Sequence, residues 1–178
     1  MKNGRVYWLT GLSGAGKSTL GSLLYEHLRS RKDSVVYLDG DILREVFGGL
    51  HGHTIDERRL LAMSYARMCR ILSLQGIDVV CATISMFHSV RRWNRENIPA
   101  YFEVYLNVPI EVLIQRDQKQ LYSRALRGEV SDVMGVNVDI EAPESPDVVL
   151  VNDGSHGPEE LLYQLLSSIE EVLVEKAR

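Results

Sequence analysis

A glycine-rich stretch, GLSGAGKST at residues 11–19, constrains this chain more than any other feature. It follows the apolar run VYWLT at residues 6–10 and precedes a helical pattern over residues 18–31. The stretch matches G-x-x-x-x-G-K-S, in which glycines let the backbone turn so that successive N–H groups face a polyphosphate. A glycine-rich turn without a ligand is the alternative, but the flanking strand and helix favour the phosphate-binding motif.

Four more apolar, β-branched runs recur along the chain, and most lack the alternation of a half-exposed strand. Together with the first run, they predict parallel strands at residues 6–10, 35–38, 79–84, 104–108 and 148–151. The helical patterns predict helices at residues 18–31, 55–74, 88–97, 110–116 and 157–176. Strand and helix alternate, so we expect an α/β fold whose five-stranded parallel sheet is flanked by helices.

Composition limits the classes of function. The 178 residues, 45% of them hydrophobic, predict a single domain over residues 1–178. A net charge of −4 provides no field for nucleic acid, so we expect neither a nucleic-acid nor a membrane partner. Cys69 and Cys81 have no zinc-like spacing, and the chain shows no secretory apolar region, so we expect a cytoplasmic protein.

Two groups of polar residues carry the predicted chemistry. Lys17 can neutralise the outer phosphates of a nucleoside triphosphate, and Ser18 can ligate Mg²⁺. LDGD places Asp39 and Asp41 at the carboxyl end of the predicted second strand, where ligands of open α/β sheets bind. Either carboxylate could meet the metal or the attacking hydroxyl. In the alternative interpretation, this is an acidic turn in which Asp41 caps the next helix.

Residues 117–146 form an irregular segment between the last two predicted strands. The segment contains six acidic residues together with basic residues, two glycines and two prolines. A connection of this length is typical of a functional loop, and we expect it to act as a lid over the site.

The motifs GLSGAGKST, LDGDILR, ATISMF and QRDQKQLYSRALRGEV, followed by EAPESP, resemble the adenylylsulfate kinase family in order and spacing. The resemblance implies a P-loop kinase fold, a lid, a homodimer, and Mg·ATP-dependent phosphorylation of the ribose 3′-hydroxyl of a small nucleotide. The ATP site would comprise Gly11, Ser13, Gly14, Ala15, Gly16, Lys17, Ser18, Thr19 and Arg116. The resemblance assigns catalysis to Lys17, Asp39, Asp41 and Lys119, metal binding to Ser18 and Asp39, and the acceptor to Arg44, Arg58, Ile84, Ser85, Lys119 and Tyr122. In the alternative interpretation, Arg44, Arg58 and Lys119 are solvated surface charges.

The departures from the family pattern concentrate where the acceptor base binds. The family places two phenylalanines against its adenine, and this chain has His53 and Val133 there. Other family positions are changed at Leu61, Met63, Ser64 and Met86. Stacking contributes on the order of 1–3 kcal/mol per base, so these changes predict a different acceptor base. Trp93 is either a replacement stacking face or an ordinary core residue.

The stretch ATISMF at residues 82–87, with Trp93 and Asn94, resembles a capsule-associated branch of the family. That branch phosphorylates the 3′-hydroxyl of cytidine diphosphoramidate during synthesis of a phosphoramidate-decorated polysaccharide. We place this acceptor slightly ahead of adenylylsulfate. A nucleotide-binding regulator without acceptor chemistry is a further alternative, although the retained Asp39, Asp41 and Lys119 argue against it. A small-metabolite kinase is disfavoured by the lid motifs. The basic run RRWNR at residues 91–95 is interpreted as a solvated face or as ion-pair partners.

Overall fold

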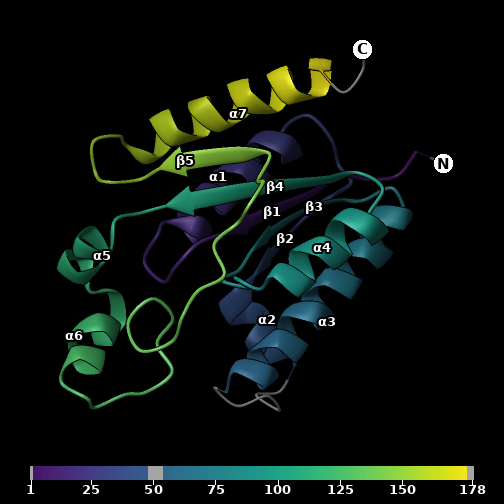
Figure 1. Ribbon diagram of the computed structural model, residues 1–178. Coiled ribbons are helices and arrows are strands. Elements are labelled where there is room, and N and C mark those ends of the chain that lie inside the picture. The colour runs from purple at the N-terminus through teal and green to yellow at the C-terminus, as the bar shows by residue number, and fades with distance from the viewer. Residues whose placement is uncertain (1, 48–53, 176–178) are drawn as a thin grey trace.

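The computed structural model describes residues 2–47 and 54–175, and a parallel sheet forms its centre (Figure 1). The strands lie in the order β2-β3-β1-β4-β5, and each neighbouring pair is parallel. They are β1 (Val6–Thr10), β2 (Val35–Asp39), β3 (Asp78–Ala82), β4 (Tyr101–Asn107) and β5 (Val148–Val151). The expected α/β class and the five-stranded parallel sheet are confirmed.

Helices cover both faces of this sheet. α1 and α7 pack together on one face, and α3 and α4 pack together on the other (Figure 1). The helices are α1 (Lys17–Arg29), α2 (Gly40–Val46), α3 (Ile55–Leu74), α4 (His88–Asn97), α5 (Ile110–Arg116), α6 (Leu121–Leu126) and α7 (Pro158–Glu175). Among the described residues, no helix combines the length and apolar character that crossing a bilayer requires.

The core forms where the central strands meet the helices. All five residues of β1 are buried, including Trp8 at 0% exposure, because β1 has a strand on each side and helices on both faces. On α3, Leu61 and Tyr65 are buried as their spacing predicts. Cys81 in β3 is also fully buried, which confirms its expected place inside the sheet.

The third strand is shorter than its apolar run predicts. β3 ends at Ala82, whereas the expected strand continued to Ile84. Polar bonds explain the early end: the Thr10 hydroxyl donates to the Ile84 carbonyl, and the hydroxyls of Thr83 and Ser85 lie 2.8 Å apart. Ser85 then turns away with a left-handed φ of 29°, a conformation that non-glycine residues rarely adopt outside constrained sites.

The segment of residues 117–146 is less irregular than expected. It contains a 3₁₀ turn (Gln118–Gln120) and helix α6. The carboxylate of Asp117 accepts hydrogen bonds from the backbone N–H groups of Tyr122 and Ser123, so it fixes the start of α6. Tyr122 is fully buried and donates its hydroxyl to the Ser13 carbonyl at 2.7 Å. The sequence analysis missed this helix because it is short and follows left-handed residues at Lys119 and Gln120.

Replacing Tyr122 by phenylalanine should lower the free energy of unfolding by about 1 kcal/mol. The change removes one buried hydrogen bond and keeps the ring in place, so the lost bond to Ser13 accounts for the effect. Urea unfolding of the wild type and the variant measures it. Tyr163→Phe is the control, since that side chain is 73% exposed and should cost nothing measurable. Equal stability of both variants and the wild type would contradict the prediction.

Two arginines of the basic run on α4, Arg91 and Arg95, are ion-pair partners, whereas Arg92 is exposed. Arg91 is only 4% exposed and lies 3.4 Å from the carboxylate of Glu103, which is buried on β4. Arg95 pairs with Glu103 and with Asp147, both at 3.2 Å. The same arginines donate to carbonyls of the incoming chain, Arg91 to Glu141 and Arg95 to Ser145, both at 2.6 Å. The returning part of the 117–146 segment is therefore tied to the sheet.

Candidate active site

The glycine-rich turn joins β1 to α1 at the carboxyl edge of the sheet. Its glycines are needed for their backbone: Gly14 and Gly16 have left-handed φ values of 76° and 92°. At Gly11 a side chain is excluded by a steric clash, because a Cβ there would lie 2.6 Å from the Leu106 carbonyl oxygen. The turn thus directs its N–H groups and the start of α1 outward, which is the arrangement that favours an anion.

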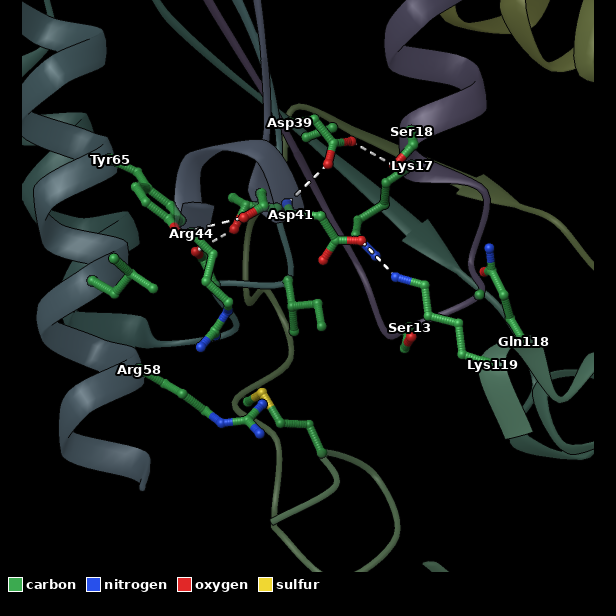
Figure 2. Close-up of a pocket in the computed structure, with 18 of the residues that line it drawn as sticks. Ser13, Lys17, Ser18, Asp39, Asp41, Arg44, Arg58, Tyr65, Gln118 and Lys119 are labelled. Carbon is green, nitrogen blue, oxygen red and sulfur yellow. Dashed lines mark hydrogen bonds and ion pairs between the residues drawn. The ribbon is translucent and has the colours of Figure 1, made fainter. Parts of the chain in front are cut away.

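Most predicted site residues come together around one open pocket beside this turn (Figure 2). Those lining it are Ser13, Gly14, Lys17, Ser18, Asp39, Asp41, Arg44, Arg58, Ile84, Ser85 and Lys119. The sequence analysis did not single out Gln118 and Tyr65, which also line it. In the sequence, the hydroxyl of Tyr65 was the only signal that this residue belongs to a site. In the structure that hydroxyl donates to the Gly40 carbonyl oxygen at 3.4 Å.

Lys17 lies at the start of α1, and its ammonium group donates to the Leu12 carbonyl at 2.7 Å. Burial lowers the pKa of Lys17 from 10.5 to about 8, although Asp39 and Asp41 act in the opposite direction. A bound polyphosphate favours the charged form, so phosphate binding and protonation of Lys17 are linked.

ATP affinity should therefore fall as the pH rises above about 8. Because Lys17 must hold a proton to pair with phosphate, the apparent dissociation constant should increase about fivefold between pH 8 and pH 9. Calorimetric titration of ATP over this range measures the change. Lys17→Arg is the matched control, since a guanidinium stays charged throughout and should give a flat profile. The same slope in both proteins would assign the effect to another group.

Asp39 is the more constrained of the two carboxylates. It accepts hydrogen bonds from the Ser18 hydroxyl at 2.6 Å, from the Tyr37 hydroxyl at 3.0 Å and from the Asp41 N–H at 2.9 Å. Burial would raise the pKa of Asp39, but these hydrogen bonds outweigh it and hold the pKa below its usual value. Asp39 is also the N-cap of α2, so the interpretation of Asp41 as the helix cap is wrong.

Asp41 lies two residues further along, in the first turn of α2, and its side chain faces the 117–146 segment. Its carboxylate pairs with the Lys119 ammonium at 2.7 Å, and both side chains are largely exposed (Figure 2). The hydrogen bond to Asp41 raises the pKa of Lys119. Lys119 reaches the pocket because its backbone is left-handed, with φ of 60°. The ion pair between Asp41 and Lys119 joins the first turn of α2 to the 117–146 segment.

The two predicted acceptor arginines project from α2 and α3 into the same pocket (Figure 2). Burial and the neighbouring charge of Arg44 lower the pKa of Arg58, whereas Asp132 raises it. Arg58 shares one pocket with Arg44 and the adjoining hollow with Asp132. Two neighbouring guanidinium groups repel each other unless an anion lies between them, so this arrangement fits a phosphate-like linkage.

A second hollow at Arg58 adjoins the pocket and is lined in part by the 117–146 segment. Branched or flexible apolar side chains, among them Ile84, Leu121 and Val133, form most of its wall. Ser13, Ser131 and Asp132 add polar atoms. No aromatic side chain is among its described lining residues.

Another hollow lies on the α7 side of the glycine-rich turn. It is lined by Gly16, Thr19, Leu20, Arg116, Asn152, Gly154, His156, Pro158 and Leu161. Asn152 connects its walls, because it donates to the Ala15 carbonyl at 3.0 Å and accepts from Arg116 at 3.1 Å. Our sequence analysis missed Asn152, although its position directly after β5, at the ligand-binding edge, was a usable signal.

Some predicted residues lie elsewhere. Tyr122 does not line the pocket but supports the glycine-rich turn from beneath, and Ala15 is fully buried. Trp93 packs against the hydrophobic core and is not among the pocket residues, so the core interpretation is confirmed. His53 lies outside the described residues.

The oxygen ligands at the carboxyl edge suit a hard divalent cation. The Ser18 hydroxyl and the Asp39 carboxylate converge at 2.6 Å, and oxygen atoms are the ligands that Mg²⁺ prefers. Among the described residues no group of three or more His, Cys, Asp or Glu side chains could hold a metal ion by itself.

The parallel sheet, the glycine-rich turn and the neighbouring lysine and carboxylates define a P-loop phosphotransferase that uses ATP with a divalent metal. Within that class, the chain belongs to the adenylylsulfate kinase family, because residues 3–151 match the family model described as adenylylsulphate kinase.

Individual relatives agree with this assignment. The cytidine diphosphoramidate kinase of Campylobacter jejuni is 38% identical over 170 residues, covering 95% of this chain and 99% of that protein. The adenylyl-sulfate kinase of Deinococcus deserti is 43% identical over 150 residues, covering 84% of this chain and 83% of that protein. The solved APS kinase of Mycobacterium tuberculosis, in complex with AMPPNP and APS, superimposes with a TM-score of 0.84 at 27% identity, covering 96% and 99%.

Proposed function

We propose that this protein phosphorylates the ribose 3′-hydroxyl of cytidine diphosphoramidate, using Mg·ATP, in the synthesis of a capsular polysaccharide phosphoramidate. The observation that carries the proposal is the aliphatic hollow beside Arg58, where Val133 stands in place of an adenine-stacking phenylalanine. The near full-length similarity to the Campylobacter jejuni cytidine diphosphoramidate kinase supports the same acceptor.

In this proposal the phosphate groups of ATP lie on the glycine-rich turn, with Lys17 against the outer phosphates. The nucleoside of ATP occupies the hollow formed by Thr19, Arg116 and Asn152. Ser18 and Asp39 hold Mg²⁺, which would neutralise charge on the transferring phosphoryl group. Preorganised positive charge is the main contribution to phosphoryl transfer, so the position of Lys17 matters more than its basicity.

The acceptor lies across the pocket from the phosphates. Arg44 and Arg58 bind its charged linkage, and Ile84 and Ser85 contact its nucleoside. Asp41 orients the 3′-hydroxyl and accepts its proton as the new bond forms, while Asp39 stays with the metal. This division follows from their contacts, since Asp39 is held by Ser18 and Tyr37 while Asp41 faces Lys119 and the open pocket.

Lys119 belongs to both the acceptor site and the 117–146 segment. We propose that this segment closes over the two substrates as a lid, which would exclude water and bring Lys119 against the phosphates. Tyr122 contributes indirectly by fixing the segment to Ser13. Residues 1–178 would act as one kinase domain, and the active species would be a homodimer.

The first test measures ADP release with Mg·ATP and two acceptors, cytidine diphosphoramidate and adenylylsulfate, with the product phosphate located by phosphorus NMR. Efficient turnover of the cytidine compound to its 3′-phosphate is the expected result. Adenylylsulfate turnover alone would favour the second candidate, adenylylsulfate kinase, which the 43% identity to the Deinococcus deserti enzyme supports. Turnover of neither would contradict both and favour a nucleotide-binding regulator.

A further inference from the structure

The turn of residues 130–138 presents one carboxylate to the hollow beside Arg58. Asp132 lines this hollow, and its side chain is partly buried there. Its backbone is left-handed, with φ of 61°, which an aspartate tolerates better than most residues do. The Ser131 hydroxyl donates to the Asp132 carboxylate at 2.8 Å and leaves most of its acceptor positions available.

The turn itself is held in place. Asn137 accepts from the Val133 N–H at 2.7 Å and donates to the Val130 carbonyl at 3.3 Å, while the Gly135 N–H donates to the Val138 carbonyl at 2.8 Å. A Cβ on Gly135 would lie 2.9 Å from the Leu12 side chain, so the turn packs closely against the glycine-rich loop. Asp132 is thus fixed relative to the pocket and is not carried by a loose surface loop.

The aliphatic wall of the hollow cannot distinguish one base from another by hydrogen bonding. Arg58 is committed to the anionic linkage in the proposed function, and the hydroxyls of Ser13 and Ser131 can both donate and accept. Among the described lining residues, this leaves Asp132 as the carboxylate, and an ionised carboxylate only accepts. It requires an N–H donor from the ligand and repels a carbonyl oxygen placed at the same point.

We propose that Asp132 is a specificity-determining residue that accepts a hydrogen bond from the exocyclic amino group of the acceptor base. The inference rests on the proposed function, because it assumes that the hollow beside Arg58 holds that base. Cytosine carries such an amino group where uracil carries a carbonyl, and aspartate accepts from the cytosine amino group in other recognition sites. Asp132 therefore selects amino bases over their keto counterparts.

The test compares binding of CDP and UDP, measured calorimetrically with Mg²⁺ and with the ATP site saturated by a non-hydrolysable ATP analogue. The wild type should bind CDP at least about tenfold more tightly than UDP, as expected for a hydrogen bond to a charged group. Asp132→Ala should lose this preference by weakening CDP binding about tenfold and changing UDP binding less than threefold. Asp132→Asn should also lose it, because an amide can turn either its donor or its acceptor towards the base.

Asp139→Asn is the matched control, since it removes an exposed carboxylate from the same segment and should keep the preference for CDP. A general disturbance of the turn would weaken both nucleotides alike and leave the ratio unchanged. An unchanged ratio in Asp132→Ala, or equal binding of both nucleotides by the wild type, would overturn the inference.

The inference and the proposed function fail in different ways. If cytidine diphosphoramidate is converted to its 3′-phosphate and Asp132→Ala keeps the CDP preference, only the role of Asp132 is overturned. If the preference depends on Asp132 but no 3′-phosphate forms, the reaction is overturned and the base contact stands. If neither CDP nor UDP binds, the hollow is not the base site, and the inference falls with that assignment.

Discussion

Replacing Lys17 by alanine is expected to reduce kcat by about 10³-fold or more. Lys17 is the first residue of α1, and it lines the same pocket as Asp39 and Asp41. Removal of its ammonium group leaves the transferring phosphoryl group without that charge, and a water molecule cannot replace it. The measurement is ADP release at saturating Mg·ATP and acceptor, using whichever nucleotide the wild type turns over.

Lys2→Ala provides the comparison, because Lys2 is exposed and lies outside the pocket. It should retain wild-type activity. The Lys17→Ala variant should still fold, since Lys17 is only half-buried and is not part of the hydrophobic core. Substantial residual turnover in a folded Lys17→Ala protein would contradict the assignment of the phosphate site.

Replacing Glu103 by alanine is expected to lower the free energy of unfolding by about 3–5 kcal/mol. Glu103 is 2% exposed and lies within 3.4 Å of the buried Arg91 and 3.2 Å of Arg95. Burial raises the pKa of Glu103 even though both arginines act to lower it. Burying the Glu103 carboxylate therefore costs free energy. Removing the carboxylate alone costs more stability, because the buried charge of Arg91 then loses this partner.

Denaturant unfolding measures the loss, with Glu96→Ala as a control on the exposed side of α4. A second variant separates charge from packing. Replacing Arg91 and Glu103 together by methionine and leucine should recover most of the stability, because no unpaired charge then remains in the core. If Glu103→Ala changed stability by less than 1 kcal/mol, the buried ion pairs would have no major role in the fold.

The sequence predicted the parts of the fold that depend on long apolar patterns. The five strands were predicted from apolar, β-branched runs and the long helices from a 3.6-residue stripe, and those patterns come from local chain geometry. Burial is continuous in β1, whereas β5 alternates between buried and exposed residues. The end of β3 and the start of α6 were not predicted, because each depends on a single side chain, Thr10 in one case and Asp117 in the other. A polar bond between distant residues leaves no periodic signal.

The residues of the candidate site also fall into two groups, those predicted from the sequence and those seen only in the structure. The P-loop motif and the LDGD stretch predicted Lys17 and Asp39 as site residues, and the family resemblance predicted Arg44 and Arg58; the structure brings all four together around one pocket. Asn152 and Asp132 were missed because each acts through its position on a loop: one follows β5, and the other depends on a left-handed backbone. Sequence patterns give the type and the spacing of residues. Neither the type nor the spacing predicts in which direction a loop points a side chain.

The contact between Asp41 and Lys119 is an ion pair that links the start of α2 to the 117–146 segment across the pocket. Its side chains are 78% and 70% exposed, so mobile ions reach it freely. At an ionic strength of about 1 M the screening length shrinks to about 3 Å, close to the length of the contact itself. The attraction that holds this segment to the catalytic edge therefore varies with the salt content of the surrounding solution, whereas the buried contacts of Arg91 are largely protected from it.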